Sequence, residues 1–254
     1  MQRIVIKISC LILIAVSSLF PQQYTEGSPE WLVHEFFNSS SFLKKSNYYT
    51  GEMITDKELP TIGEELSDSN AQALFYKVKE EGDVQIFTVE LELNEQVIDF
   101  YCYLKSVDNI WKIEAIRRFL LPGFLYSIRD SLSILSSPSA ADINLQKTLE
   151  LFTMNNARLK NYLSNNVDEL LNVVWYFNQN ESEEANKSLS SLGCNAVYKD
   201  NRFSNCVFIQ INSFERMEAG FIYATDSSTI PPMSSTEFIY VEQVLPDWFI
   251  YRIM

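Results

Sequence analysis

The spacing of apolar residues changes from helical to alternating within the first half of the chain. Ser28-Pro29-Glu30 is typical of a helix start, and apolar residues then recur every three or four positions as far as Asn47. Residues 51–69 are acidic and broken by Pro60, and we interpret them as a short helix or an irregular excursion. From residue 71 onward, apolar and polar positions alternate in four runs, with turns at 81–83, 94–95 and 108–109. Strands joined by such short turns pair antiparallel, so residues 28–135 predict an α+β domain.

The second half repeats this order of helices followed by strands. Residues 136–141 read Ser-Ser-Pro-Ser-Ala-Ala, which predicts a linker between two domains. Helical spacing follows between residues 142 and 191, and alternating runs predict strands at 207–211, 220–224, 238–244 and 248–253. Residues 142–254 therefore predict a second α+β domain. Each half ends in a hairpin that turns at an Asp and resumes at a Trp, so a duplication stays open as an alternative.

The beginning of the chain has the form of an export signal. Arg3 and Lys7 precede an uncharged, mostly apolar run from Ile8 to Phe20. This run is shorter than the roughly 20 apolar residues of a membrane-spanning helix. Residues 1–20 therefore predict a signal peptide and an exported protein, periplasmic or secreted, with no stable membrane span after cleavage. An uncleaved N-terminal anchor is the alternative.

Composition excludes several classes of function. The net charge of −13 argues against a nucleic-acid partner, because a phosphate backbone needs a basic surface. The 7 glycines do not form a phosphate-binding loop, and the single histidine excludes His-rich metal sites. We therefore expect no metal and no cofactor. The hydrophobic fraction of 46% is that of a globular protein.

Three cysteines remain after the apolar run. Cys194 and Cys206 bracket a polar stretch that contains a good turn, which favours a disulfide between them in an oxidising compartment. The alternative is a pair of buried, unpaired thiols. Cys102 lies in a strand pattern, and we interpret it as a small buried hydrophobic residue.

The first half also resembles a known family. A leading helix, a long hairpin and a closing strand that reads Val107-Asp108-Asn109-Ile110-Trp111-Lys112-Ile113-Glu114-Ala115-Ile116 are similar to the nuclear-transport-factor-2-like superfamily. The resemblance covers about residues 28–119 and implies a curved sheet wrapped around a helix as a cone. Members of the superfamily include enzymes, ligand binders and interaction modules, so the fold alone does not select a function. The second half resembles uncharacterised exported bacterial proteins.

One strand of the first half carries the best candidate for a ligand site. Asp99, Tyr101 and Tyr103 share one face of that strand. Inside an apolar cone, a Tyr–Asp pair can hold a polar ligand group or stabilise an enolate. The alternative is that these residues form the polar, aromatic outer face of a half-buried sheet. No catalytic motif of the superfamily can be matched residue by residue.

These observations favour a non-catalytic module that binds a small molecule or a protein. The missing catalytic motifs, the export signal and the cone-like first half support this hypothesis. The first alternative is an isomerase- or dehydratase-like enzyme that uses Asp99 and Tyr101, which requires both side chains to line a closed pocket. The second alternative is a structural or assembly module of the cell envelope.

The export signal can be tested by intact mass. Protein purified without reductant from cells that export it is expected to begin between Ser17 and Tyr24, because small residues there offer cleavage positions. A two-proton deficit in the same spectrum reports a disulfide. A mass that corresponds to the complete chain supports the uncleaved anchor instead.

Overall fold

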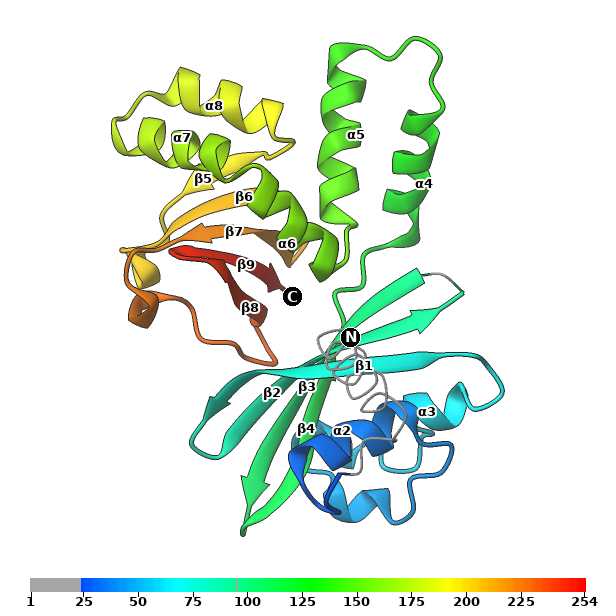
Figure 1. Ribbon diagram of the computed structural model, residues 1–254. Coiled ribbons are helices and arrows are strands. Elements are labelled where there is room, and N and C mark those ends of the chain that lie inside the picture. The colour runs from blue at the N-terminus through cyan, green and yellow to red at the C-terminus, as the bar shows by residue number, and fades with distance from the viewer. Residues whose placement is uncertain (1–23, 95) are drawn as a thin grey trace, which may run out of the picture.

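Two antiparallel sheets and seven helices build the part of the chain described by the computed structural model, residues 24–94 and 96–254 (Figure 1). The first sheet has the strand order β1-β2-β3-β4, and the second has the order β5-β6-β7-β9-β8. The predicted α+β class is therefore confirmed. The proposed signal peptide, residues 1–20, lies outside the described residues. Among residues 24–94 and 96–254, no helix is long and apolar enough to cross a membrane.

The first sheet is the predicted four-stranded meander, preceded by helical turns. Its strands are β1 (Gln72–Glu81), β2 (Val84–Leu93), β3 (Gln96–Val107) and β4 (Ile110–Arg117). The preceding elements are α2 (Pro29–Asn38), η1 (Lys45–Tyr48), η2 (Gly51–Ile54) and α3 (Ile62–Glu65).

The first helix is shorter than its apolar spacing predicts. Ser28 caps α2 by accepting a hydrogen bond from the Trp31 amide, as the sequence indicates. The helix then ends at Asn38 rather than near Asn47. The Asn38 side chain bonds both the amide and the carbonyl of Ala73 on β1 at 3.0 Å, which fastens the helix end to the sheet edge. The Ser39 hydroxyl bonds the backbone of Ser41, and such local bonds compete with helix continuation.

Glu64 organises the irregular segment between α2 and β1. Its side chain completes a capping box with Thr61 and also bonds the amide of Phe42 and the ammonium group of Lys45. Burial alone raises the pKa of Glu64, but the bonds from Lys45, Thr61 and Phe42 outweigh it and lower the pKa to about 2. The acidic stretch thus contains two short helical turns, η2 and α3, which agrees with the first of its two interpretations.

The two faces of the first sheet are both covered. Phe87, Val89, Phe100 and Cys102 pack beneath α2 in a mainly aromatic and aliphatic core, so Cys102 is the buried hydrophobic residue that the pattern predicts. The side chains of the opposite face belong to a second core, which continues into the other half of the molecule. The residues of the first sheet in this shared core are Ile86, Tyr101, Tyr103 and Ala115.

The second half begins with five helices. They are α4 (Gly123–Ser133), α5 (Ala140–Phe152), α6 (Asn156–Asn165), α7 (Val167–Asn178) and α8 (Ser182–Ser191). The sequence boundary at 136–141 assigns α4 to the first domain, but α4 forms a helical hairpin with α5 (Figure 1). Its Leu125 lies in the shared core, and the ring of Phe124 contacts Phe214 of the second sheet. By packing, α4 therefore belongs with the second half.

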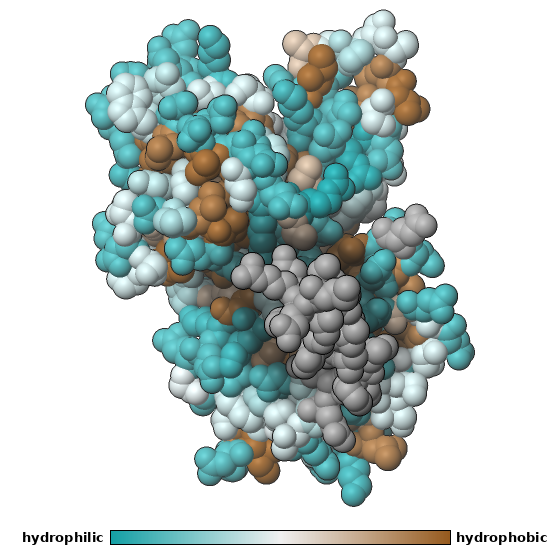
Figure 2. Space-filling model, in the orientation of Figure 1, coloured by the Kyte–Doolittle hydropathy of each residue, from teal (hydrophilic) through white to brown (hydrophobic). Residues whose placement is uncertain are grey.

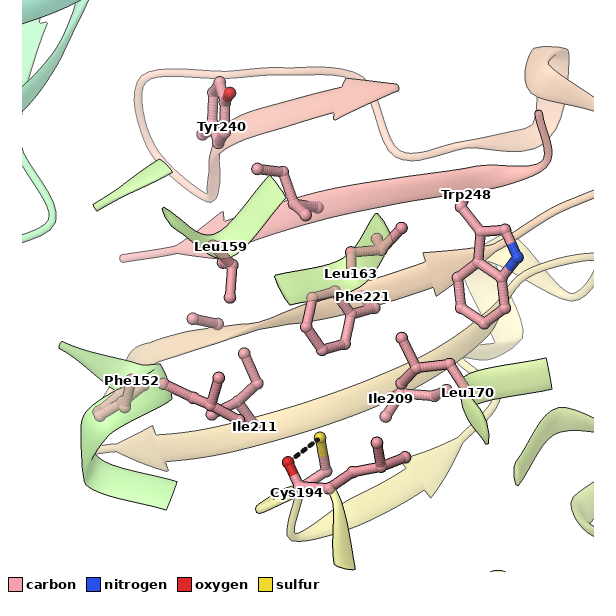
Figure 3. Close-up of a cluster of buried hydrophobic side chains, with 14 of the residues drawn as sticks. Phe152, Leu159, Leu163, Leu170, Cys194, Ile209, Ile211, Phe221, Tyr240 and Trp248 are labelled. Atoms are coloured by element: carbon pink, nitrogen blue, oxygen red, sulfur yellow. Dashed lines mark hydrogen bonds between the residues drawn. The ribbon is translucent and has the colours of Figure 1, made fainter. Parts of the chain in front are cut away.

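The second sheet separates two apolar clusters. Its strands are β5 (Ala196–Tyr198), β6 (Val207–Phe214), β7 (Met217–Tyr223), β8 (Phe238–Leu245) and β9 (Trp248–Ile253), with η3 (Asn201–Phe203) and η4 (Ser227–Thr229) in the connections. Figure 3 shows the cluster between the sheet and the helices, where Phe152, Leu159 and Leu163 meet Ile209 and Phe221. A smaller aromatic cluster around Phe208, Phe238 and Tyr251 covers the other face.

The structure does not contain the predicted Cys194–Cys206 disulfide. Both thiols are free and buried. Cys194 lies in the core beneath the helices, where its Sγ is 3.9 Å from the Leu192 carbonyl (Figure 3). Cys206 lies in the aromatic cluster on the opposite face. The sheet lies between them, because the two clusters pack against opposite faces of it. Burial raises the pKa of the Cys194 thiol to about 12.

Gly220 supplies a test of how closely the second sheet is packed. A Cβ atom at this position would lie 2.2 Å from the Ile209 carbonyl oxygen and 2.9 Å from the Tyr251 ring. We expect Gly220→Ala to lower the free energy of unfolding by about 1–3 kcal/mol, measured by urea denaturation. Gly123→Ala is the matched control, because nothing lies within 4 Å of its added Cβ. Equal stabilities of the two variants would contradict the close approach.

Candidate functional site

The three predicted ligand-site residues lie on the face of the first sheet that the second half covers. Tyr101 is in register with Thr88 of β2 on one side and with Arg117 of β4 on the other, and Thr88 pairs with Tyr76 of β1. Residues paired in this way share one face of a sheet. The row Tyr76–Thr88–Tyr101–Arg117 therefore spans all four strands and points at the second half. Asp99 and Tyr103 lie on the same face of β3, because they are two residues from Tyr101.

Asn156, the first residue of α6, lies at the centre of the contact between the first sheet and the second half. Its backbone amide donates a hydrogen bond of 2.6 Å to Asp99 Oδ2. Its side-chain Oδ1 accepts bonds from the Tyr101 hydroxyl at 3.1 Å and from Arg252 Nε at 3.0 Å. Arg252 also donates to the Met154 carbonyl at 2.6 Å, and its guanidinium group lies 4.6 Å from the Phe119 ring centroid. Asn156 thus joins β3, α6 and β9.

A second group of contacts lies where α6 and β8 meet β1. Lys160 Nζ donates to the Tyr76 hydroxyl at 2.8 Å and to Glu242 Oε1 at 2.6 Å. The Tyr240 hydroxyl also donates to Glu242, and its ring stacks on Tyr101 with centroids 4.8 Å apart. Burial lowers the pKa of Lys160, but its bonds to Glu242 and Tyr76 outweigh this effect and raise it. The ammonium group therefore stays charged in the contact.

The third group lies at the other end of the row. The Tyr103 hydroxyl lies 2.8 Å from the Ile239 carbonyl and 3.0 Å from the Ser234 carbonyl. Arg117 Nε donates to the Ser235 carbonyl at 2.5 Å, while its Nη2 bonds Glu52 of the first half. We call these three groups of contacts together the interdomain seam.

In this structure, the predicted site residues take part in the interdomain seam. Tyr101 is completely buried and Tyr103 nearly so, and both hydroxyls bond groups of the second half. Burial raises the pKa of both phenols. Burial also raises the pKa of Asp99, opposed by Arg252 and by the Asn156 amide. The enzyme alternative requires Asp99 and Tyr101 to line a pocket. Neither residue lines either of two hollows on the described surface.

Two hollows occur elsewhere on the described surface. One, of about 180 Å³, lies in the first half, where Phe36 of α2, Met53 of η2 and Ile116 of β4 line it. The other, of about 450 Å³, lies in the second half and is polar, with Asn178, Asn205 and Lys199 along it. Neither was indicated by the sequence, because their walls come from segments far apart along the chain.

The hairpin of α4 and α5 carries exposed apolar side chains. We call them the hairpin patch, and its members are Phe124, Ile128, Ile134, Leu135, Ile143 and Leu145. Ile134, at the end of α4, is 83% exposed. Figure 2 shows hydrophobic surface at the far end of this hairpin. The signal was present in the sequence as apolar residues at 124 and 128, followed by Ile134-Leu135 directly before the Ser- and Pro-rich turn.

The two helices of the hairpin are fixed by side-chain hydrogen bonds and by packing in the shared core. Ser139 and Asp142 form a capping box at the start of α5. Arg129 of α4 donates to Thr153 Oγ1 at 2.9 Å, and Leu125 and Leu149 of the facing helices lie in the shared core. The exposed residues of α4 and α5 therefore lie on ordered helices, and Ile134 and Leu135 lie in the turn that joins them.

The comparisons add no family. No protein-family model matches the chain, and no curated protein matches it in sequence. Across residues 24–94 and 96–254, no three His, Cys, Asp or Glu side chains gather as a metal site would require.

The charge state of Asp99 can be tested through stability. Because its pKa is raised in the fold, the protonated form is favoured there, and stability rises as the pH falls toward the unfolded value of about 3.9. Asp99→Asn lacks this titration. We expect the variant to be at least as stable as the wild type at neutral pH. As the pH is lowered, the free energy of unfolding of the wild type should rise relative to that of the variant.

Urea denaturation across this pH range measures the difference between the two proteins. Glu92→Gln, on the exposed end of β2, is the control for the loss of one negative charge. A variant that is less stable than the wild type at neutral pH, by a difference that shrinks as the pH is lowered, would show that Arg252 holds the pKa of Asp99 below its unfolded value instead.

Proposed function

We propose that the chain is a non-catalytic protein-binding module that docks through the hairpin patch. The observation that carries this proposal is a set of six apolar side chains exposed on one projecting helical hairpin. Isolated exposed apolar residues are ordinary, whereas a group of them on one element is typical of an interaction surface. Export and the likeness of the first half to nuclear-transport-factor-2-like modules are part of the same proposal.

The arrangement of the hairpin supports a protein partner. Ile134 and Leu135 lie at the turn, where a partner can approach without meeting either sheet (Figure 1). The helices behind them are already fixed by the Ser139 capping box and the Arg129–Thr153 bond, so docking orders few additional groups. Preorganisation of this kind lowers the entropic cost of binding.

The seam supports the non-catalytic part of the proposal. A catalytic acid or base must reach a reacting group. Asp99, Tyr101 and Tyr103 bond the second half instead, so a substrate would have to separate the halves before it could touch them. This geometry favours binding at the outer surface over turnover in the first sheet.

Site-specific photo-crosslinking in the cells that produce the protein tests the docking surface. We expect a photoreactive residue at Ile134 to give one discrete protein adduct, and one at Leu43 to give none. Leu43 is the matched control, because it is 79% exposed but lies in the first half. A second change, Ile128→Asp, should remove the adduct formed from position 134. Its side chain is partly exposed, so the melting temperature should shift by no more than about 2 °C.

Each other outcome contradicts a defined part of the proposal. Equal adducts from positions 134 and 43 would show nonspecific contact. An adduct with a second copy of the chain, together with a dimer in light scattering, would replace the proposal with the structural or assembly module. Absence of any adduct would remove the hairpin patch as the docking surface.

A further inference from the structure

The hollow in the first half has an apolar wall with charge at its rim. Its volume is about 180 Å³, which suits a small ligand or a single side chain rather than a large molecule. Phe36, Met53 and Ile116 form part of the wall, and Phe36 and Met53 are almost completely buried. A wall of this kind favours an apolar chain or ring.

The charged groups that line the hollow determine whether it favours a cationic or an anionic ligand. Arg117 is its one lining cation among the described residues, and each of its three guanidinium nitrogens already donates a hydrogen bond. These bonds go to Ser235, Ile116 and Glu52. Glu52 therefore neutralises the charge of Arg117, and three of its five N–H groups are already in use, which makes it a weak site for an anion. Asp56, by contrast, forms no ion pair with another residue of the described chain and is exposed at the rim.

Tyr49 supplies a second, independent indication. It lines the hollow and is 4% exposed, and its hydroxyl makes no hydrogen bond with any residue of the described part. Because this oxygen is not among the fully buried atoms that lack a partner, it is accessible from solvent. A phenolic oxygen can accept a hydrogen bond from an ammonium group, and the face of the ring attracts a cation. Burial, together with the nearby Glu64, raises the pKa of Tyr49, so the group is the neutral phenol. The net charge of −13 also draws cations toward the surface.

We propose that this hollow binds an organic cation: an ammonium group on a short apolar chain, with the chain against Met53 and Ile116 and the charge beside Asp56 and Tyr49. The same chemistry is found in a free alkyl amine and in a lysine side chain of a peptide. The proposal is independent of the hairpin patch, which belongs to the other half of the molecule.

Methyl NMR on the complete protein tests it with three probes of equal chain length: hexylammonium, hexanol and hexanoate. We expect hexylammonium to bind most tightly and to shift the methyl signals of Met53 and Ile116. Asp56→Asn should weaken hexylammonium about three- to fivefold, as expected for the loss of one exposed ion pair. Asp68→Asn, which removes an equal charge from another exposed position, should leave its affinity unchanged. Leu59→Lys places a cation at the exposed rim and should weaken hexylammonium further.

The results separate the proposal from its alternatives. Equal affinity for hexanol and hexylammonium, tighter binding of hexanoate, or no shift at Met53 and Ile116 would each overturn it. A lysine blocked at both backbone ends distinguishes the two sources of the ammonium group. If it binds at least as tightly as hexylammonium, the occupant is a peptide side chain, and if it is excluded, the occupant is a free amine. Ile134→Asp should not change these affinities, so failure of the hairpin proposal is a separate result.

Discussion

The burial of Asn156 in the interdomain seam is the interaction on which the arrangement of the two halves depends. A polar side chain with no exposed surface must find hydrogen-bond partners inside the protein. Asn156 Oδ1 finds them in Tyr101 of the first half and Arg252 of the second, and its backbone amide bonds Asp99, whereas its Nδ2 has no partner among the described residues. The outer face of the first sheet is polar and aromatic, and the second half supplies hydrogen-bond partners for Tyr101, Tyr103 and Asp99 Oδ2. Thr88 Oγ1 and Asp99 Oδ1 are buried without a partner among the described residues. The relative placement of the halves is therefore specified by hydrogen bonds and not by apolar contact alone.

This constraint also explains where functional surfaces can occur. Both faces of the first sheet are covered, one by the helices of its own half and the other by the second half at the seam. What stays open lies at the periphery: the hairpin that rises beyond the second core, and the hollow beside β4. Arg117 belongs to both the seam and the hollow, because it bonds Ser235 across the seam and Glu52 at the rim of the hollow. The seam and the hollow are thus mechanically connected through one side chain.

The candidate residues show what a sequence pattern can and cannot identify. Alternation placed Asp99, Tyr101 and Tyr103 on one face of a strand, and the structure has them there. Alternation does not say what covers that face, and Asn156, 57 positions from Asp99, was not anticipated as its partner. The same limit applies to the cysteines. Cys194 and Cys206 are close along the chain, but the sheet lies between their side chains.

The sequence by itself determined the α+β class, the Ser28 cap, the four-stranded meander and most strands of the second sheet, because these depend on local periodicity and on short turns. Only the tertiary structure decided that α2 ends at Asn38, that α4 joins α5, and that β9 lies between β7 and β8. It also decided that the polar face of β3 is buried and that the hairpin patch is exposed. These outcomes depend on contacts between residues far apart along the chain, whose free energy is set by packing and hydrogen bonding in three dimensions and leaves no periodic trace in the sequence.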